Sequence, residues 1–125
     1  AIITTGRMLS TAKAVADALR TERISVHVKE LPTACPINKA EIIASAMQCG
    51  VVITIEDNVL SGGFGERVAG ILAENDVHPH FRAFGFPDEP IVHGSIAELD
   101  RKYGVDADTI AGYIIREVRN GKDKT

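Results

Sequence analysis

A chain of 125 residues is long enough for one domain with a continuous core and too short for two. Its hydrophobic fraction of 45% and charged fraction of 25% are typical of a globular protein and exclude a disordered one. The net charge of −3 predicts no nucleic-acid partner and no membrane partner, and no apolar run approaches the roughly 18 residues of a membrane span.

The two cysteines suggest neither a metal site nor a redox site. Cys35 and Cys49 form no CxxC pair, and no histidine stands at the spacing of a zinc pattern. We expect two buried, reduced thiols in a cytoplasmic protein, since the chain also lacks the regions of a secretory signal. Ala1 already begins a strand-like run without a start methionine, so we expect a fragment of a longer chain or a chain whose first residues are missing.

Strand and helix patterns alternate along the chain. Residues 24–28 alternate apolar and polar side chains, which is the period of a half-buried strand, whereas residues 51–55 are apolar or β-branched throughout, as in a strand covered on both faces. Capping boxes are predicted at Asn38 with Glu41 and at Ser95 with Glu98. The predicted elements are a strand at 1–5, a helix at about 8–21, a strand at 24–28, a helix from 38 to 50, a strand at 51–55, a helix from 64, a strand at 79–84, a short edge strand at 91–93, and helices that start after 95 and 106.

Three successive strand and helix units call for a largely parallel sheet with helices on both faces. We therefore predict one doubly wound α/β domain over residues 1–120, followed by a frayed tail at 121–125.

The segment 51–67 contains the most informative motif. An apolar strand ends at two carboxylates, and a glycine cluster then leads into residues spaced for a helix. In an open α/β sheet, ligands and partner domains meet the chain where the strand order reverses. The residues predicted to border this crevice or interface are Arg7 and Ser10 after the first strand, and Glu56, Asp57, Asn58, Ser61, Gly62, Gly63 and Gly65 after the third.

The glycine turn before Phe64 raises the hypothesis of a phosphate site, because a helix start offers free N–H groups. Three features argue against it. The turn follows the third strand rather than the first, and after Gly65 no glycine that could complete the GxGxxG pattern comes before Gly70. No Lys-Ser or Lys-Thr pair completes a P-loop, and Glu56 and Asp57 would repel a phosphate. The favoured interpretation is a tight turn that lets two elements or two subunits approach closely. The predicted crevice residues carry both signs of charge, with Arg7 beside Glu56 and Asp57, and such a mixed rim favours a domain contact over an anion pocket.

Other catalytic or metal patterns are weaker. Ser61 follows a strand, but the preceding glycine of a nucleophile elbow is absent, although His78, His80 and His93 follow in an order that a hydrolase could use. The His78-Pro79-His80 segment places two imidazoles on one side of an extended chain, yet no third ligand stands nearby. Surface histidines are the favoured interpretation.

Taken together, several loop motifs resemble one family. These motifs are Thr5-Gly6 after the first strand, Leu31-Pro32-Thr33 to Pro36-Ile37-Asn38, Ile55-Glu56-Asp57-Asn58 with Ser61-Gly62-Gly63-Phe64-Gly65, Gly85-Phe86-Pro87-Asp88-Glu89, and His93-Gly94-Ser95 with Tyr103-Gly104-Val105-Asp106. Their order is similar to that of the C-terminal domain of transketolase-like thiamine diphosphate enzymes. Within these enzymes it is most similar to the 1-deoxy-D-xylulose-5-phosphate synthase type, then to transketolase itself.

The resemblance implies a three-layer α/β/α domain with a mostly parallel five-stranded sheet. It also implies that other domains of a homodimeric transferase hold thiamine diphosphate and magnesium, because the family's Gly-Asp-Gly segment and activating glutamate are not found in this chain. No catalytic, cofactor-binding or metal-binding role is therefore assigned to any residue. The glycine-rich loop is implied to lie near the contact with the preceding domain or partner subunit.

Two hypotheses follow from these observations. In the first, the chain is a non-catalytic support domain of an enzyme that transfers a two-carbon unit. In the second, it is a free-standing α/β module that binds a small anion or nucleotide at the crevice. Asn58 and Asn38 depart from the residues common in the family, so the subfamily stays open, including a decarboxylase subunit of a 2-oxo acid dehydrogenase.

Overall fold

The computed structural model describes residues 1–5, 8–31, 37–87 and 95–123. Its elements are β1 (Ile2–Thr4), α1 (Leu9–Thr21), β2 (Val28–Glu30), α2 (Lys39–Gln48), β3 (Val51–Val59), α3 (Phe64–Glu74), β4 (His80–Phe86), α4 (Ile96–Lys102) and α5 (Ala107–Asp123). No helix in these ranges is long and apolar enough to cross a membrane.

The described strands form one parallel sheet in the order β2-β1-β3-β4. Ile2 of β1 pairs with Val28 on one side and with Ile53 on the other. The predicted α/β class with a parallel sheet is confirmed. The fifth strand predicted at 91–93 lies outside the described residues.

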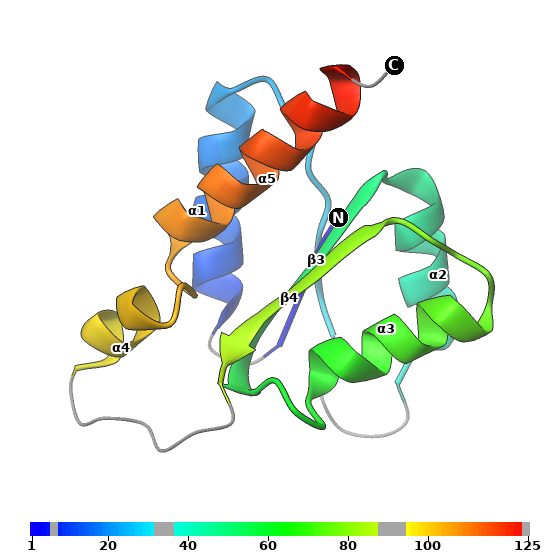
Figure 1. Ribbon diagram of the computed structural model, residues 1–125, viewed down its shortest axis with the longest axis horizontal. Coiled ribbons are helices and arrows are strands. Elements are labelled where there is room, and N and C mark those ends of the chain that lie inside the picture. Colours follow the sequence, from blue (N-terminus) through cyan, green and yellow to red (C-terminus); the bar gives the residue numbers. More distant parts are fainter. Residues whose placement is uncertain (6–7, 32–36, 88–94, 124–125) are drawn as a thin grey trace.

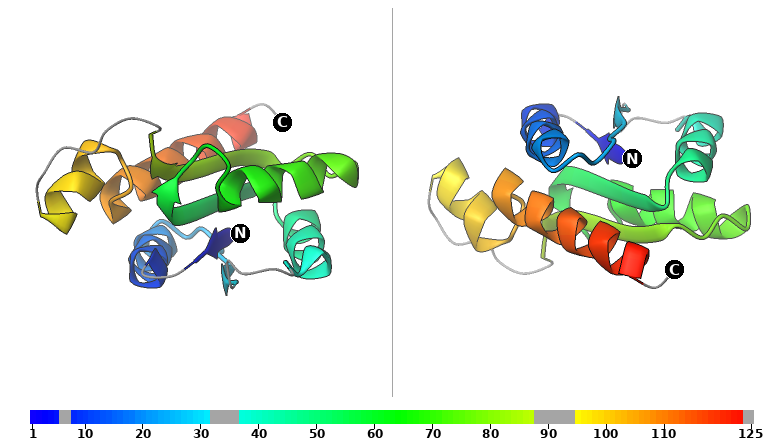
Figure 2. Two further views of the ribbon diagram at one scale, coloured as in Figure 1. Left: turned by 90° about the horizontal axis from the view of Figure 1, so that it is seen from below. Right: turned by 90° about the horizontal axis from the view of Figure 1, so that it is seen from above.

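Helices cover both faces of this sheet (Figure 1), with α1 and α5 on one side and α2 and α3 on the other. Alternate residues of each strand enter the two cores: Ile2 and Ile53 pack toward α1 and α5, whereas Ile3 and Val52 pack toward α2 and α3. Figure 2 shows α4 at one end of the molecule, beyond the start of α5.

Local signals place most helix starts where the sequence predicts them. Asn38 accepts a hydrogen bond from the backbone N–H of Glu41, and Ser95 accepts one from Glu98. Asp106 caps α5 by accepting from Thr109 at 3.1 Å. The last helix is longer than predicted, since α5 continues to Asp123 rather than ending near residue 120.

The prediction of a strand at 24–28 is wrong in its position. The strand β2 begins only at Val28, because Ile2 is the first residue of β1 that pairs with it. The alternating residues before Val28 therefore have no neighbouring strand with which to pair. Cys49, predicted to be buried, is a free thiol that is only half-buried, and Cys35 lies outside the described residues.

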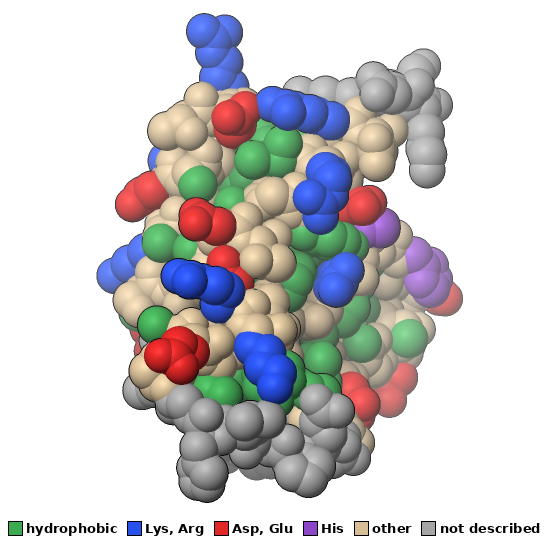
Figure 3. Space-filling view, turned by 60° about the vertical axis from the view of Figure 1, so that its left-hand side comes forward, with side chains coloured by type: hydrophobic (Ala, Val, Ile, Leu, Met, Phe, Trp, Pro, Cys, Tyr) green, Lys and Arg blue, Asp and Glu red, His purple; other side chains and the backbone are tan. Residues whose placement is uncertain are grey.

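The face formed by α1, α4 and α5 mixes both signs of charge with apolar side chains (Figure 3). Arg119 of α5 meets Glu22 at 2.6 Å, and Arg20 meets Asp17 at 2.9 Å within α1. This face is not a continuous basic surface of the kind that binds nucleic acid.

Candidate functional site

The strand order locates the switch point of the fold. The chain leaves β1 for β2 on one side and later returns to β3 on the other side, so the order reverses between β1 and β3. Glu56, Asp57 and Asn58 lie in the carboxyl half of β3, which is longer than predicted and reaches Val59. The pairing with β4 is irregular between Ile55 and Val59, at the edge where the candidate site lies.

Glu56 is the central residue of this edge, and it points into the protein. Only 1% of its surface is exposed. One carboxylate oxygen accepts from the N–H of Phe64 at 3.0 Å, and the other accepts from the N–H of Gly65 at 2.6 Å. These N–H groups belong to the first turn of α3, where a helix has no internal acceptors and a partial positive charge. The chain thus supplies its own anion at the start of α3.

Burial raises the pKa of Glu56 above its usual value of 4.5, because removal from water disfavours the charged form. The hydrogen bonds from Gly65 and Phe64 oppose this shift, and the nearby charge of Glu66 adds to it. The group is therefore a desolvated carboxyl whose charge is stabilised by backbone dipoles.

Gly65 allows α3 to approach the sheet. A Cβ atom at this position would lie 2.6 Å from the Cβ of Ala83 on β4 and 2.8 Å from the Oγ1 of Thr54 on β3. It would also lie 3.0 Å from the carboxylate of Glu56. Only a residue without a side chain fits there, which agrees with the interpretation of the glycine cluster as a close-approach turn.

The loop before α3 has an outer, exposed part. Gly62 has a φ of +69°, a conformation that glycine adopts without strain, and its N–H donates to Glu66 at 2.8 Å. Ser61 and Gly62 are exposed, as is Asp57, whereas Gly63 is buried. The residues predicted as one interface therefore form two groups. Asp57, Ser61 and Gly62 are exposed, whereas Glu56, Gly63 and Gly65 are buried and shape the loop from inside.

The remaining candidates stand on another element or include atoms outside the described residues. Ser10 is exposed on the first turn of α1, beyond β1. Arg7 lies outside the described residues, and so does the side chain of Asn58.

The histidines do not join this site. His80 stands at the amino end of β4, where its Nε2 lies 2.9 Å from the Tyr113 hydroxyl and 3.0 Å from Glu117. Parallel strands place that position at the sheet edge opposite Ser61, so the two cannot form a nucleophile and base pair. His78 meets Asp76 at 3.6 Å instead, and His93 lies outside the described residues.

Comparison with known proteins identifies the family. The family model described as the C-terminal domain of transketolase matches residues 1–110. The chain belongs to this family.

Several relatives in this family are much longer than this chain. It is 36% identical over 110 residues to the 1-deoxy-D-xylulose-5-phosphate synthase of Heliobacterium modesticaldum, and the match covers 88% of the chain and 17% of that protein. It is 32% identical over 119 residues to the enzyme of the same name from Caldanaerobacter subterraneus subsp. tengcongensis, with coverages of 95% and 19%. The chain spans less than a fifth of either relative.

A solved structure shares the fold. This structure, described as "Split gene transketolase, inactive beta4 tetramer", superposes with a TM-score of 0.80 at 29% sequence identity. The match covers 92% of this chain and 37% of that one. Membership in the transketolase C-terminal family thus agrees with the arrangement of helices and strands described above.

Sequence reasoning found Glu56 but did not predict that it points into the protein. The sequence pattern groups Glu56 with Asp57 as part of a rim, whereas the structure buries Glu56 as the cap of α3. The signal was present in the period of the strand: Glu56 shares the face of Thr54 and Val52, which lies beneath α3.

Proposed function

We propose that this chain is the C-terminal domain of a thiamine diphosphate-dependent transferase that moves a two-carbon unit, of the 1-deoxy-D-xylulose-5-phosphate synthase or transketolase type. Its role is to support contacts between domains and subunits, and the cofactor is bound elsewhere. Family membership over residues 1–110 is the observation that carries this proposal. The names of the curated relatives support the synthase type.

The start of α3 does not fit a cofactor diphosphate. The N–H groups of Phe64 and Gly65, which would donate to a phosphate oxygen, already donate to the Glu56 carboxylate. A second anion at this place would be repelled by the negative charge of Glu56. This arrangement disfavours the alternative of a free-standing anion-binding or nucleotide-binding module. Thiamine diphosphate and magnesium are accordingly assigned to the other domains of the complete enzyme, where the cofactor supplies the carbanion chemistry.

The exposed group at the carboxyl edge is proposed to contact the preceding domain or a partner subunit. It comprises Ser10, Asp57, Ser61 and Gly62, together with Arg7 and Asn58 from the sequence prediction. Glu56, Gly63 and Gly65 contribute from inside by fixing the loop. The assembled enzyme is proposed to be a cytoplasmic homodimer, which native mass measurement would test.

Two experiments test the function. Calorimetric titration of the chain with thiamine diphosphate and magnesium should give no heat of binding, and tight binding would refute the proposal. In the second, the chain replaces the matched segment of the Heliobacterium modesticaldum synthase. The chimera should transfer a two-carbon unit from a 2-oxo acid to an aldehyde, whereas the synthase lacking that segment should not.

The superposed split-gene transketolase is described as an inactive tetramer, and we expect that this chain by itself likewise does not turn over substrate. A chain that converted a 2-oxo acid and an aldehyde without any added domain would contradict the proposed role.

A further inference from the structure

A buried hydroxyl without a partner lies beneath the start of α3. Thr54 of β3 is 0% exposed, and its Oγ1 has no hydrogen-bond partner among the described residues. Thr4 on the adjacent strand β1 is equally buried, but its hydroxyl donates to the carbonyl of Ile55 at 3.2 Å. A buried hydroxyl normally has such a partner, because it has given up its bonds to water. The hydroxyl of Thr54 therefore calls for an explanation.

This hydroxyl lies close to the carboxyl of Glu56. A Cβ atom placed on Gly65 would lie 2.8 Å from Thr54 Oγ1 and 3.0 Å from Glu56 Oε2, so both oxygens border the same point at the first turn of α3. Thr54 and Glu56 also share one face of β3, because side chains alternate along a strand. The same point lies 2.6 Å from the Cβ of Ala83, which leaves no room there for a water molecule or a ligand. The Glu56 carboxyl is therefore the partner that Thr54 has at hand.

In the described arrangement, the carboxyl bonds to α3 and not to Thr54. Its oxygens accept from the N–H groups of Phe64 at 3.0 Å and Gly65 at 2.6 Å. Bonds of this kind draw strength from the negative charge of the acceptor. Protonation of Oε2 removes that charge, weakens the hold of the Gly65 N–H and gives Oε2 a proton to donate. The Thr54 hydroxyl oxygen, whose lone pairs are unused, is a suitable acceptor for this proton.

A second carboxylate stands at the same helix start. Burial is the main cause that raises the pKa of Glu56, and the charge of Glu66 in the first turn of α3 adds to it. Glu66 is exposed, and its Oε2 accepts from the N–H of Gly62 at 2.8 Å. Because like charges repel, each carboxylate makes the ionised form of the other less favourable. The charge of the buried group is thus coupled to a bond in the exposed loop.

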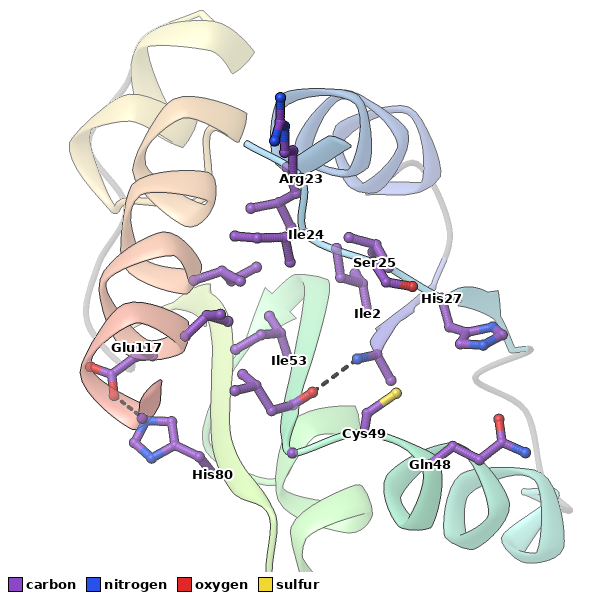
Figure 4. A pocket seen from close by; sticks show the side chains of 18 of the residues that line it. Ile2, Arg23, Ile24, Ser25, His27, Gln48, Cys49, Ile53, His80 and Glu117 are labelled. Carbon is purple, nitrogen blue, oxygen red and sulfur yellow. Dashed lines mark hydrogen bonds and ion pairs between the residues drawn. The ribbon is translucent and has the colours of Figure 1, made fainter. Parts of the chain in front are cut away.

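The other charged groups of the described residues near Glu56 are exposed or far away. Asp57 follows it on β3 and Arg67 lies on α3, and both are exposed. Figure 4 shows His80 and Glu117 joined across 3.0 Å at the amino edge of the sheet, beside a pocket of about 730 Å³. β3 begins at that edge, five residues before Glu56, which is roughly 16 Å at the rise of a strand and too far for direct contact. The coupling that matters is the one between the two carboxylates at the start of α3.

We propose that Thr54 and Glu56 form a buried proton site that controls the exposed loop before α3. A proton from water binds Oε2 of Glu56, and the new O–H donates to Oγ1 of Thr54. The loss of negative charge removes the repulsion on Glu66, whose bond to the N–H of Gly62 then becomes stronger. Proton uptake thus orders the loop, and proton release loosens it. The meaning of this switch for contacts between domains rests on the proposed function, whereas the proton site itself does not.

The first test is a ¹³C nuclear magnetic resonance titration of the Glu56 carboxyl in the native chain, in Thr54→Val and in Thr54→Ser. Valine has nearly the shape of threonine but no hydroxyl, so the proton affinity of Glu56 should fall about threefold or more in Thr54→Val. Serine keeps the hydroxyl and should restore most of the native affinity. An unchanged or increased affinity in Thr54→Val would overturn the proposal, since the hydroxyl would then be idle or would donate to the ionised carboxylate. A Thr54→Ser chain that titrates like Thr54→Val would overturn it as well.

The second test follows the loop by amide hydrogen exchange. Protection of the Gly62 amide, relative to an unfolded chain at the same pH, should rise about twofold as the pH falls through the titration of Glu56. In Glu56→Gln the buried side chain carries no charge at any pH, so this rise should be absent. Protection that ignores the titration in the native chain, or follows it in Glu56→Gln, would overturn the proposal. Neither test uses substrate or cofactor, so failure here leaves the results of the calorimetric titration and the chimera unaffected.

Discussion

The two edges of the sheet satisfy their backbone groups in different ways. At the carboxyl edge, the Glu56 carboxylate bonds to the free donors of α3, and Gly65 brings the helix against Thr54 and Ala83. At the amino edge, the N–H of His27 and the carbonyl of Ser25 have no hydrogen-bond partner among the described residues, beside a pocket lined by apolar and polar side chains. A glycine-rich turn that resembles a ligand site can thus have its free donors occupied by the protein's own carboxylate, whereas a plain strand start can keep backbone groups unpaired among the described residues.

The largest effect is expected from Gly65→Val. The added atoms would overlap Ala83 and Thr54, so we expect a loss of about 3 kcal/mol in the free energy of unfolding. Chemical denaturation measures this loss. Gly70→Ala in the same helix is the matched control, because nothing lies within 4 Å of a Cβ there, and it should be neutral or slightly stabilising. Equal effects of the two substitutions would contradict the close-approach role of Gly65.

Removal of the internal anion should have the next largest effect. Glu56→Ala leaves two buried N–H groups of α3 without their acceptor, so we expect a loss of about 2 kcal/mol in the free energy of unfolding. Glu74→Gln, at the exposed end of α3, should change it by less than about 0.5 kcal/mol. A Glu56→Ala variant as stable as the Glu74→Gln variant would show that the carboxylate does not hold the turn.

A smaller effect concerns pH. Because burial raises the pKa of Glu56 above 4.5, the folded protein binds this proton more tightly than the unfolded chain does. The stability from this protonation is present below pH 4.5 and is lost as the pH rises through the folded pKa. As the pH rises from 4.5 through the folded pKa of Glu56, the free energy of unfolding of the native chain should therefore fall relative to that of the Glu56→Gln variant. A difference that instead grows with pH would mean that the helix dipole outweighs desolvation.

The smallest effect is expected at the open edge. Val26→Thr should cost about 0.5 kcal/mol in the free energy of unfolding, since Val26 is only partly covered. Chemical denaturation measures this cost, and a cost as large as that of Glu56→Ala would show that Val26 is more completely covered than the structure has it.

The sequence predicted the architecture well where the signal is local. Helix starts at Asn38, Ser95 and Asp106 depend on bonds within one turn, and the structure has each of them. The alternating pattern before Val28 was real, but a strand also needs a neighbour, and pairing depends on residues far away in the sequence. The length of β3 beyond Ile55 was missed for the same reason, since its end pairs with Phe86.

The candidate site shows the same division. The sequence alone determined that a strand, a carboxylate pair and a glycine turn follow one another, because composition and spacing decide such local features. Only the tertiary structure decided that Glu56 faces α3 while Asp57 faces outward, that Gly65 meets Ala83, and that the amino edge carries a pocket. The physical reason is that burial, close contact and strand pairing are properties of segments brought together by folding, and no single segment specifies its neighbours.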